Sequence, residues 1–394
     1  MDQSKKDVSL EALRGFAAIV VVFWHCMLGF FPARSGIFNY FSPDDALVGH
    51  PWFGLLNGNA AVGFFFVLSG FVLTRRYFQK KDDLSIARGV VKRWPRLAVP
   101  VTATVLMSWA IFKFDLYSYT NVAPITNSSW LYYFAFAYQT PFEPNLWSAI
   151  MQGGFFTFFR GDSYYDSSLW TMRFELIGSY VAFALAFFLI RLSGGSKWLA
   201  IFLITVVILL CHYASANYVA FPAGVALAFL LARRPFVLPF WVAGSLLILS
   251  GYLAGYTGNV IGAYRLFGDI GSQNIPVVYV HIVASVVAIV AVEAWAGVRR
   301  MLENRLFLVI GEISFPLYLV HVPVLCSAGC WAFLAALPHD PQMAPWVGAA
   351  VTVIASFIAA VPLMLLNRAW LAALNRFIGR AIPAQSTTPL SSDS

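Results

Sequence analysis

Charged side chains are scarce in this chain of 394 residues. Asp, Glu, Lys and Arg together make up 11% of it, whereas 60% of the residues are apolar. The mean hydropathy of +0.72 lies well above the range typical of soluble domains. So little charge excludes an ordinary water-soluble globular protein and indicates one that crosses a membrane several times.

Cysteine is also rare, and it does not form a ligand set for a metal. The four cysteines, Cys26, Cys211, Cys326 and Cys330, all lie in or beside apolar runs, where free thiols behave as small hydrophobes. Cys326 and Cys330 share one face of a helix, but a zinc site would need two more ligands at suitable spacing. We expect no metal site. No internal repeat is evident, and we expect no cleavable signal peptide because the first apolar run is too long for one.

Long apolar runs are what the sequence has in abundance. Each run of about 20 residues can cross a hydrocarbon core of roughly 30 Å as a helix. The run near 306–336 is long enough to contain a break at Gly329 or an added interfacial turn. We expect an all-α bundle of about ten transmembrane helices, near 10–31, 60–76, 95–113, 168–190, 198–213, 217–232, 236–256, 275–295, 306–336 and 345–367.

The positive charge predicts the orientation of the bundle, because short loops rich in Lys and Arg stay cytoplasmic. With the N-terminus inside, most of the 26 Lys and Arg residues fall in inner segments, and only Arg34, Lys113, Arg160 and Arg265 fall in outer ones. Both termini are therefore expected to be cytoplasmic. Attraction to the inner leaflet accounts for most of the net charge of +8, so we expect a lipid bilayer and no nucleic acid as partner.

Two segments between the apolar runs are unusual. The basic inner segment TRRYFQKKDDLSIARGVVKRWPR is either an ordinary topology signal that contacts lipid headgroups or an anion site. In the second case Arg93 and Arg96, three residues apart, would form a fork for phosphate oxygens. The outer segment from Lys113 to Ser167 is rich in Trp, Tyr and Phe, and we expect short interfacial helices there. Its aromatic residues form either an anchoring belt or a platform on which a sugar stacks.

The first apolar run contains two ionisable residues, Arg14 and His25. They are 11 residues apart, which is close to three turns and about 16.5 Å of rise, so both project from one face of the helix. Isolated charges in a bilayer are costly, so the default expectation is a paired or wetted site inside the bundle. The alternative for each such residue is a simple hydrogen bond to a neighbouring helix.

Counting about 1.5 Å per residue along the other runs sorts their ionisable residues into two layers. His25, Glu175, His281 and His321 fall in one layer towards the outer side, with the alternative of a simple hydrogen bond strongest for His281. Three cations, Arg14, Arg93 and Arg96, fall in a layer near the cytoplasmic side, and Glu312 lies between. Arg173 is about 200° around the helix from Glu175, so it cannot face the same cavity and is expected to anchor the outer interface.

Five stretches in this order carry a family resemblance: LEALRGFAAIVVVFWH, FFFVLSGFVLTRR, RWPR, SLWTMRFE and ISFPLYLVHVPV. The first resembles a signature of an arginine, ten residues and a histidine, here Arg14 and His25. The chain resembles the acyltransferase-3 family, integral membrane enzymes that acylate carbohydrates and some other molecules. The resemblance implies an acyl-coenzyme A donor, by default acetyl-coenzyme A, on the cytoplasmic side and a carbohydrate or lipid-linked sugar as acceptor.

The resemblance also implies roles for the two layers. Arg93 and Arg96 would hold the phosphates of the donor, and Arg14 would help to hold the donor where it enters the bundle. His25 would be the general base, since an apolar setting favours the neutral imidazole that can accept a proton. Glu175 would orient that imidazole or share its proton, and His321 would belong to the same catalytic layer.

Several alternatives remain open from the sequence. His25 could instead take the acyl group first as a covalent intermediate. A secondary transporter or flippase would also have basic inner loops and buried titratable groups, although transporters commonly show internal repeats. A purely structural role in an export complex is a third possibility. We expect residues 1–380 to form a single integral membrane acyltransferase domain in the inner (plasma) membrane, and residues 381–394 to form a disordered cytoplasmic tail.

Overall fold

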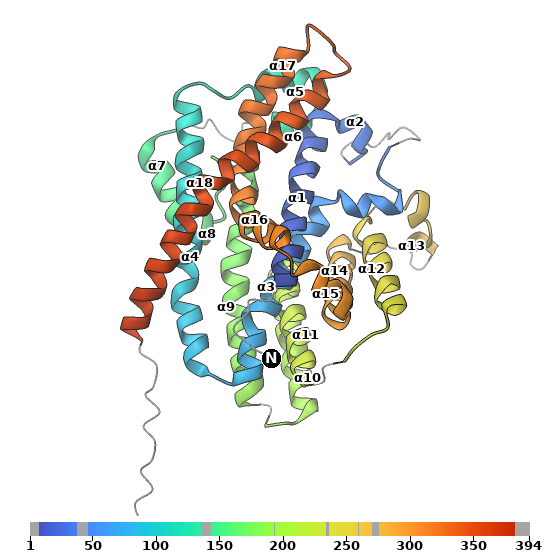
Figure 1. Cartoon of the computed structure of the whole chain (residues 1–394), viewed down its shortest axis with the longest axis vertical. Coiled ribbons are helices and arrows are strands. Elements are labelled where there is room, and N and C mark those ends of the chain that lie inside the picture. Colours follow the sequence, from blue (N-terminus) through green and yellow to red (C-terminus); the bar gives the residue numbers. More distant parts are fainter. Residues whose placement is uncertain are drawn as a thin grey trace, which may run out of the picture.

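All regular secondary structure in the described residues is helical, as predicted (Figure 1). The computed structural model describes residues 8–37, 46–134, 143–192, 194–233, 236–258, 260–269 and 276–382, so the expected tail lies almost entirely outside the described residues. Nine helical segments in these ranges are long and apolar enough to cross a membrane. They are Val8–Phe30 (α1), Gly58–Lys80 (α3), Asp83–Lys113 (α4), Ser167–Arg191 (with α9, Trp170–Arg191), Lys197–Ala214 (α10), Ala216–Arg233 (with α11, Ala220–Arg233), Val277–Ala294 (α14), Arg305–Ala336 and Ala344–Ala381 (α18).

The tenth predicted crossing is the short helix α12, Phe240–Ala254. Its 15 residues rise only about 22 Å, less than a full hydrocarbon core. At one end the N–H of Leu238 donates to the carbonyl of Ala294, the last residue of α14, at 3.0 Å. At the other end the carbonyl of Tyr256 lies 2.8 Å from Nε2 of His281, near the start of α14. Thus α12 runs antiparallel to α14 and returns the chain across the bundle.

The helices α1 and α16 (Arg305–Val324) run parallel to each other and cross closely at two glycines. A Cβ on Gly15 would lie 2.6 Å from the carbonyl oxygen of Ile310, and one on Gly311 would lie 2.7 Å from that of Glu11. Small residues at such crossings allow two backbones to approach. His25 lies ten residues beyond Gly15, and His321 lies ten residues beyond Gly311, so the two histidines are at one level of the bundle.

The last helix, α18, runs antiparallel to α16. In its second half Arg368 forms an ion pair with Glu312, which lies in the first half of α16 and next to Gly311, at the level of Glu11. At the same end of the bundle the side chain of Arg88 donates to the carbonyl of Ile382 at 2.6 Å. The first described helix therefore begins, and the last one ends, on the same side of the bundle (Figure 1).

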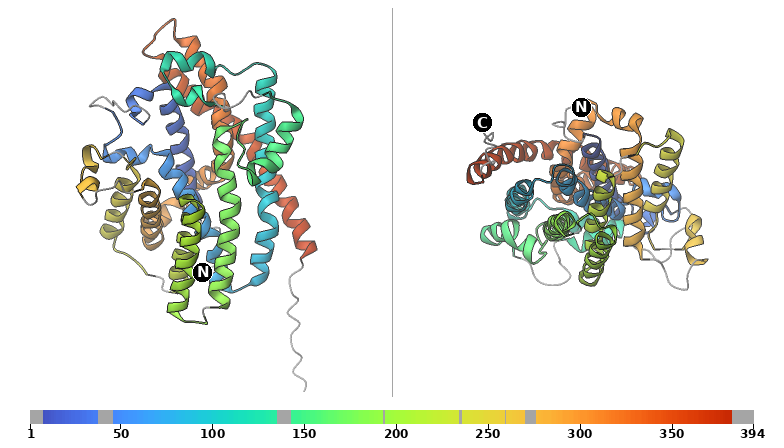
Figure 2. Two further views of the ribbon diagram at one scale, coloured as in Figure 1. Left: turned by 180° about the vertical axis from the view of Figure 1, so that it is seen from behind. Right: turned by 90° about the horizontal axis from the view of Figure 1, so that it is seen from below.

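Short helices gather at the opposite end, where Figures 1 and 2 show α5 (Tyr119–Thr126), α6 (Ser129–Tyr132) and α17 (Cys330–Ala336) together. The aromatic segment thus forms short helices as predicted, with α7 (Leu146–Met151) and α8 (Thr157–Phe159) further along. The break expected at Gly329 is a π-helical segment, Leu325–Gly329, between α16 and α17. Three further short helices are α2 (Pro32–Ser35), α13 (Leu266–Asp269) and α15 (Ala296–Leu302).

Candidate functional site

The close packing of α1 on α16 brings two histidines into contact. Nδ1 of His25 lies 2.9 Å from Nε2 of His321, and the ring centroids are 4.8 Å apart. His321 is fully buried and His25 is half-buried. The sequence placed both residues in one layer, and the structure makes them direct neighbours.

Backbone carbonyls around this pair determine its tautomers. Nδ1 of His321 lies 2.6 Å from the carbonyl oxygen of Tyr318, and Nδ1 of His25 lies 2.9 Å from that of Val21. Because a carbonyl oxygen only accepts, each Nδ1 must carry the proton when the ring is neutral. The N–H at Nδ1 of His25 then donates to two acceptors, the carbonyl oxygen of Val21 and Nε2 of His321. Nε2 of His25 keeps its lone pair, and it has no hydrogen-bond partner among the described residues.

Two aromatic residues flank the histidine pair. The ring of Trp130, from α6, lies 4.9 Å from that of His25 between centroids, and the ring of Tyr318 lies 5.7 Å from that of His321. The Tyr318 hydroxyl donates to the carbonyl of Ser168 at 2.9 Å and lies 2.9 Å from the hydroxyl of Thr171. Tyr318 belongs to the ISFPLYLVHVPV stretch that carries the family resemblance, whereas Trp130 was not predicted as a site residue, although the aromatic richness around it was a signal.

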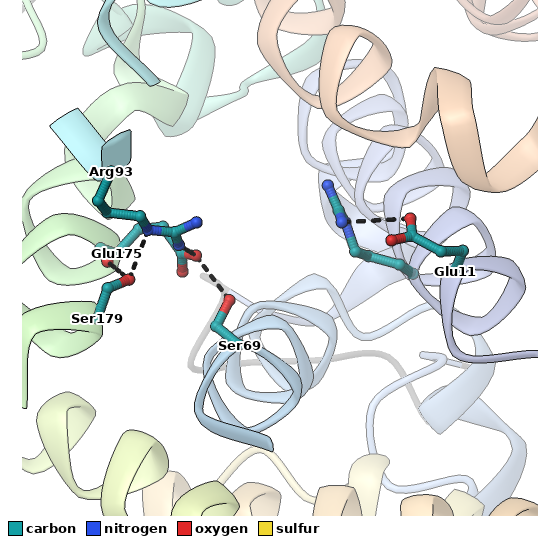
Figure 3. Close-up of polar contacts among 6 residues, drawn as sticks. Glu11, Ser69, Arg93, Glu175 and Ser179 are labelled. Carbon is teal, nitrogen blue, oxygen red and sulfur yellow. Dashed lines mark hydrogen bonds and ion pairs between the residues drawn. The ribbon is translucent and has the colours of Figure 1, made fainter. Parts of the chain in front are cut away.

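Glu175 lies elsewhere, paired with Arg93 (Figure 3). The Ser69 hydroxyl donates to Oε1 of Glu175 at 2.6 Å, and Nε of Arg93 donates to Ser179 Oγ at 2.8 Å. The expectation that Glu175 orients His25 is therefore wrong for this structure, since His321 occupies that position. The depth of a residue along a helix does not fix which neighbour it faces, and Glu175 on α9 faces α3 and α4.

A cavity of about 600 Å³ opens beside this ion pair, between α1, α3, α4, α9, α16 and α18. Five cationic residues line it: Arg14, Arg76, Lys92, Arg93 and Arg96. In Figure 3 Arg93 and its partners lie on one side of this region and Glu11 lies on the other. Glu11 accepts a hydrogen bond from Arg14 at 3.3 Å. The cationic layer predicted from the sequence is thus gathered around one space.

The two arginines of the RWPR motif differ in their partners. Arg93 is only 6% exposed and is engaged by Glu175 and Ser179. Arg96 lines the cavity, and within the described ranges it has no hydrogen bond or ion pair. Both arginines line the cavity, but the buried carboxylate of Glu175 already pairs with Arg93, so the phosphate fork of Arg93 and Arg96 stays a prediction.

The cavity is elongated along the bundle. On α3 its lining runs from Val62 to Arg76, which is about 21 Å of helix. Arg76 and Lys92 lie at the basic end, whereas Thr171 and Tyr318 lie deep inside. Neither histidine is part of the lining, but Tyr318 is one turn from His321. The space therefore leads from the basic end of the bundle to the layer next to the histidine pair.

Other ionisable residues that the sequence placed in these layers belong to different contacts. His281 is buried between α14 and α12, with Nε2 2.8 Å from the Tyr256 carbonyl, so it has the simple structural role that was the alternative. Glu312 pairs with Arg368, and Arg173 donates from the surface to the carbonyl of Arg160 at 3.4 Å. None of these three lines the cavity.

A family model, Acyl_transf_3, described as an acyltransferase domain, matches residues 7–365. No curated protein and no solved structure matches the chain. The matched range includes both histidines of the pair and all five cations of the cavity.

Proposed function

This chain belongs to the acyltransferase-3 family and is a membrane acyltransferase, and from that premise we propose that it transfers an acyl group from acyl-coenzyme A to a hydroxyl of a carbohydrate or lipid-linked sugar. Acetyl-coenzyme A is the donor that we would test first. The basic end of the bundle would face the cytoplasm of a plasma membrane, because short basic loops are retained there.

The observation that supports this proposal most is the cavity that connects the cations to the histidine layer. The phosphates of coenzyme A need cationic donors, and guanidinium groups bind phosphate oxygens in a bidentate manner. Arg96, without a partner among the residues described, together with Arg76 and Lys92, suits that end of the donor. The thin pantetheine arm would extend along the cavity towards Tyr318, placing the thioester near His25.

The chemistry then follows from the tautomer of His25. Nε2 of His25 removes the proton from the acceptor hydroxyl as its oxygen attacks the thioester carbonyl. The tetrahedral intermediate collapses, the carbon–sulfur bond breaks, and the thiolate leaves with the proton from the imidazolium. His321 holds the His25 ring through Nδ1, and the half-buried Trp130 offers a face on which a sugar ring can stack.

The test is a pair of histidine variants in the full chain, purified into lipid nanodiscs. With acetyl-coenzyme A and cell-envelope glycans, the wild type should release the free coenzyme A thiol and add one acetyl unit to the glycan, measured by mass spectrometry. His25→Ala should lower turnover by at least about 100-fold while donor binding persists. His339→Ala, which removes an exposed histidine outside the site, should turn over normally.

The outcome of this experiment separates the alternatives. Turnover retained in His25→Ala would reject the assigned base. In sealed proteoliposomes, acceptor movement across the membrane without thiol release would indicate transport. A thiol burst without acceptor, with an acylated His25 peptide, would indicate covalent transfer through the histidine instead of direct attack.

A further inference from the structure

A second, smaller cavity of about 320 Å³ lies away from the proposed donor site. It is enclosed by the ends of α3, α11 and α14, by α15, and by Phe236 and Val237 ahead of α12. Four polar residues line it, Arg75, Gln79, Glu293 and Arg299. The rest of its lining is apolar: Ala228, Leu231, Ala232, Phe236, Val237 and Ala294. The cavity therefore suits a molecule with one polar and one apolar part.

Three membrane-crossing helices end at this cavity. Gln79 lies in the last turn of α3, Ala232 in the last turn of α11, and Ala294 is the last residue of α14. A site at the ends of three spans lies at the depth of lipid headgroups rather than in the hydrocarbon core. It is on the same basic side as the donor cavity, because Arg76 of that cavity directly follows Arg75.

The two cavities are nevertheless distinct. Successive residues of a helix point about 100° apart, so Arg75 and Arg76 face different spaces on α3. Arg76 lines the larger cavity and Arg75 the smaller one, and the two linings have no residue in common. A ligand of the smaller cavity is therefore not the coenzyme A donor in another position.

The charge balance of the smaller cavity limits its ligand. Arg75 forms an ion pair with Glu293 at 2.8 Å, with side chains 22% and 8% exposed, so these two charges balance each other. Arg299 adds one further positive charge, and within the described part of the chain its guanidinium has no ion pair or hydrogen bond. Among the described lining residues the net charge is one, which matches the single negative charge of a phosphodiester. The amide of Gln79 can donate an additional hydrogen bond to a phosphate oxygen.

We propose that this cavity binds the phosphodiester headgroup of an anionic phospholipid from the adjacent leaflet. Arg299 and Gln79 bind the phosphate, and the apolar wall of Leu231, Phe236 and Val237 packs on the glycerol and the first acyl carbons. Phosphatidylglycerol, whose headgroup has no cation, fits better than phosphatidylethanolamine, whose ammonium group would lie near the arginines.

The experiment uses the delipidated full chain and native mass spectrometry with dioctanoyl phosphatidylglycerol. Arg299→Gln should weaken binding about tenfold, because a charge-assisted hydrogen bond is lost. Arg300→Gln is the matched control, since it removes the same charge from the same helix at an exposed position that lines neither cavity. Gln79→Leu, which leaves the net charge unchanged, should weaken binding severalfold. Unchanged thermal midpoints would show that the variants remain folded.

Two results would overturn the proposal. The first is equal lipid affinity in the wild type, Arg299→Gln and Gln79→Leu. The second is displacement of the lipid by inorganic phosphate at equal concentration, because the site would then bind free anions without using its apolar wall. Preference for phosphatidylglycerol over both phosphatidylethanolamine and phosphate, lost only in the two cavity variants, would support it.

Discussion

Arg93 and Arg96 lie three residues apart on α4 and have different surroundings, so we predict that their loss has different effects. Arg96→Gln removes a cation that lines the cavity and pairs with no described residue, so KM for acyl-coenzyme A should rise about tenfold with kcat nearly unchanged. Arg93→Gln leaves the buried carboxylate of Glu175 without its cation and should destabilise the protein by about 3–5 kcal/mol. Steady-state kinetics and thermal unfolding in nanodiscs measure the two effects.

The double variant Arg93→Gln with Glu175→Gln is the control for this contrast. It removes both charges of the buried pair, so it should recover part of the stability lost in Arg93→Gln. If Arg93→Gln instead raised KM without affecting thermal unfolding, the separation of the two arginines into a structural and a donor-binding residue would be wrong.

Asp166, just ahead of α9, should make the folding stability of the protein depend on pH. Its side chain is fully buried, Oδ1 accepts from the N–H of Ser168 at 2.9 Å, and Oδ2 has no hydrogen-bond partner in the parts of the chain described. Burial raises the pKa of Asp166 to about 7, although the hydrogen bond from the Ser168 N–H acts to lower it. In the unfolded chain the pKa of an aspartate is about 3.9.

Because the folded state binds the proton more tightly, the stabilisation from protonated Asp166 is complete below about pH 4 and is lost as the pH rises to about 7. Asp166→Asn keeps the acceptor oxygen and cannot ionise. As the pH rises from 5 to 7, the thermal midpoint of the wild type should therefore fall relative to that of Asp166→Asn. Thermal unfolding followed by tryptophan fluorescence measures both midpoints. Parallel curves for the two proteins over this range would contradict the buried, protonated carboxyl.

Among the elements, the crossing of α1 and α16 positions the histidine pair. A Cβ at Gly15 would lie 2.4 Å from Cγ2 and 2.6 Å from the carbonyl oxygen of Ile310, so the helices must separate to accept it. Gly15→Ala should lower both activity and the thermal midpoint, because the distance between His25 and His321 depends on this crossing. Gly244→Ala on α12 meets open space and is the matched control. Equal activity in both variants would show that the crossing does not set the site.

The sequence predicted where the helices lie and how deep each ionisable residue sits, but it did not predict which residues come into contact. The apolar runs and a rise of about 1.5 Å per residue are properties of one helix, so they placed His25 and His321 in one layer. Which helix packs against which depends on tertiary contacts, such as Gly15 on Ile310, that no single run contains. For this reason the pairing of Glu175 with Arg93 and the contact of Trp130 with His25 were not foreseen.

At the scale of the whole molecule, the number of crossings depends on α12. By length and composition nine helical segments among the described residues qualify as spans, and α12 is too short to qualify. It runs antiparallel beside α14 where the sequence predicted a tenth crossing, and that tenth crossing stays a prediction. Length and composition alone leave α12 out of the count of spans. The contacts at its two ends show that it nevertheless runs along α14 from one end to the other.

The proposed orientation can be tested by labelling single cysteines with a reagent that does not cross membranes. Lys197→Cys, at the first residue of α10, should be protected in intact cells, and His339→Cys, between α17 and α18, should be labelled. The four native cysteines are buried and should give little background. Labelling in the opposite pattern would place the basic end of the bundle outside.

The helix α3 has Arg75 in one cavity and Arg76 in another. Any tilt or rotation of this helix that widens one space must alter the other, so molecules held in the two spaces would influence each other's affinity. Thermodynamic reciprocity makes that influence equal in both directions. The rate of the enzyme at limiting donor would then respond to the lipid composition of the membrane around it.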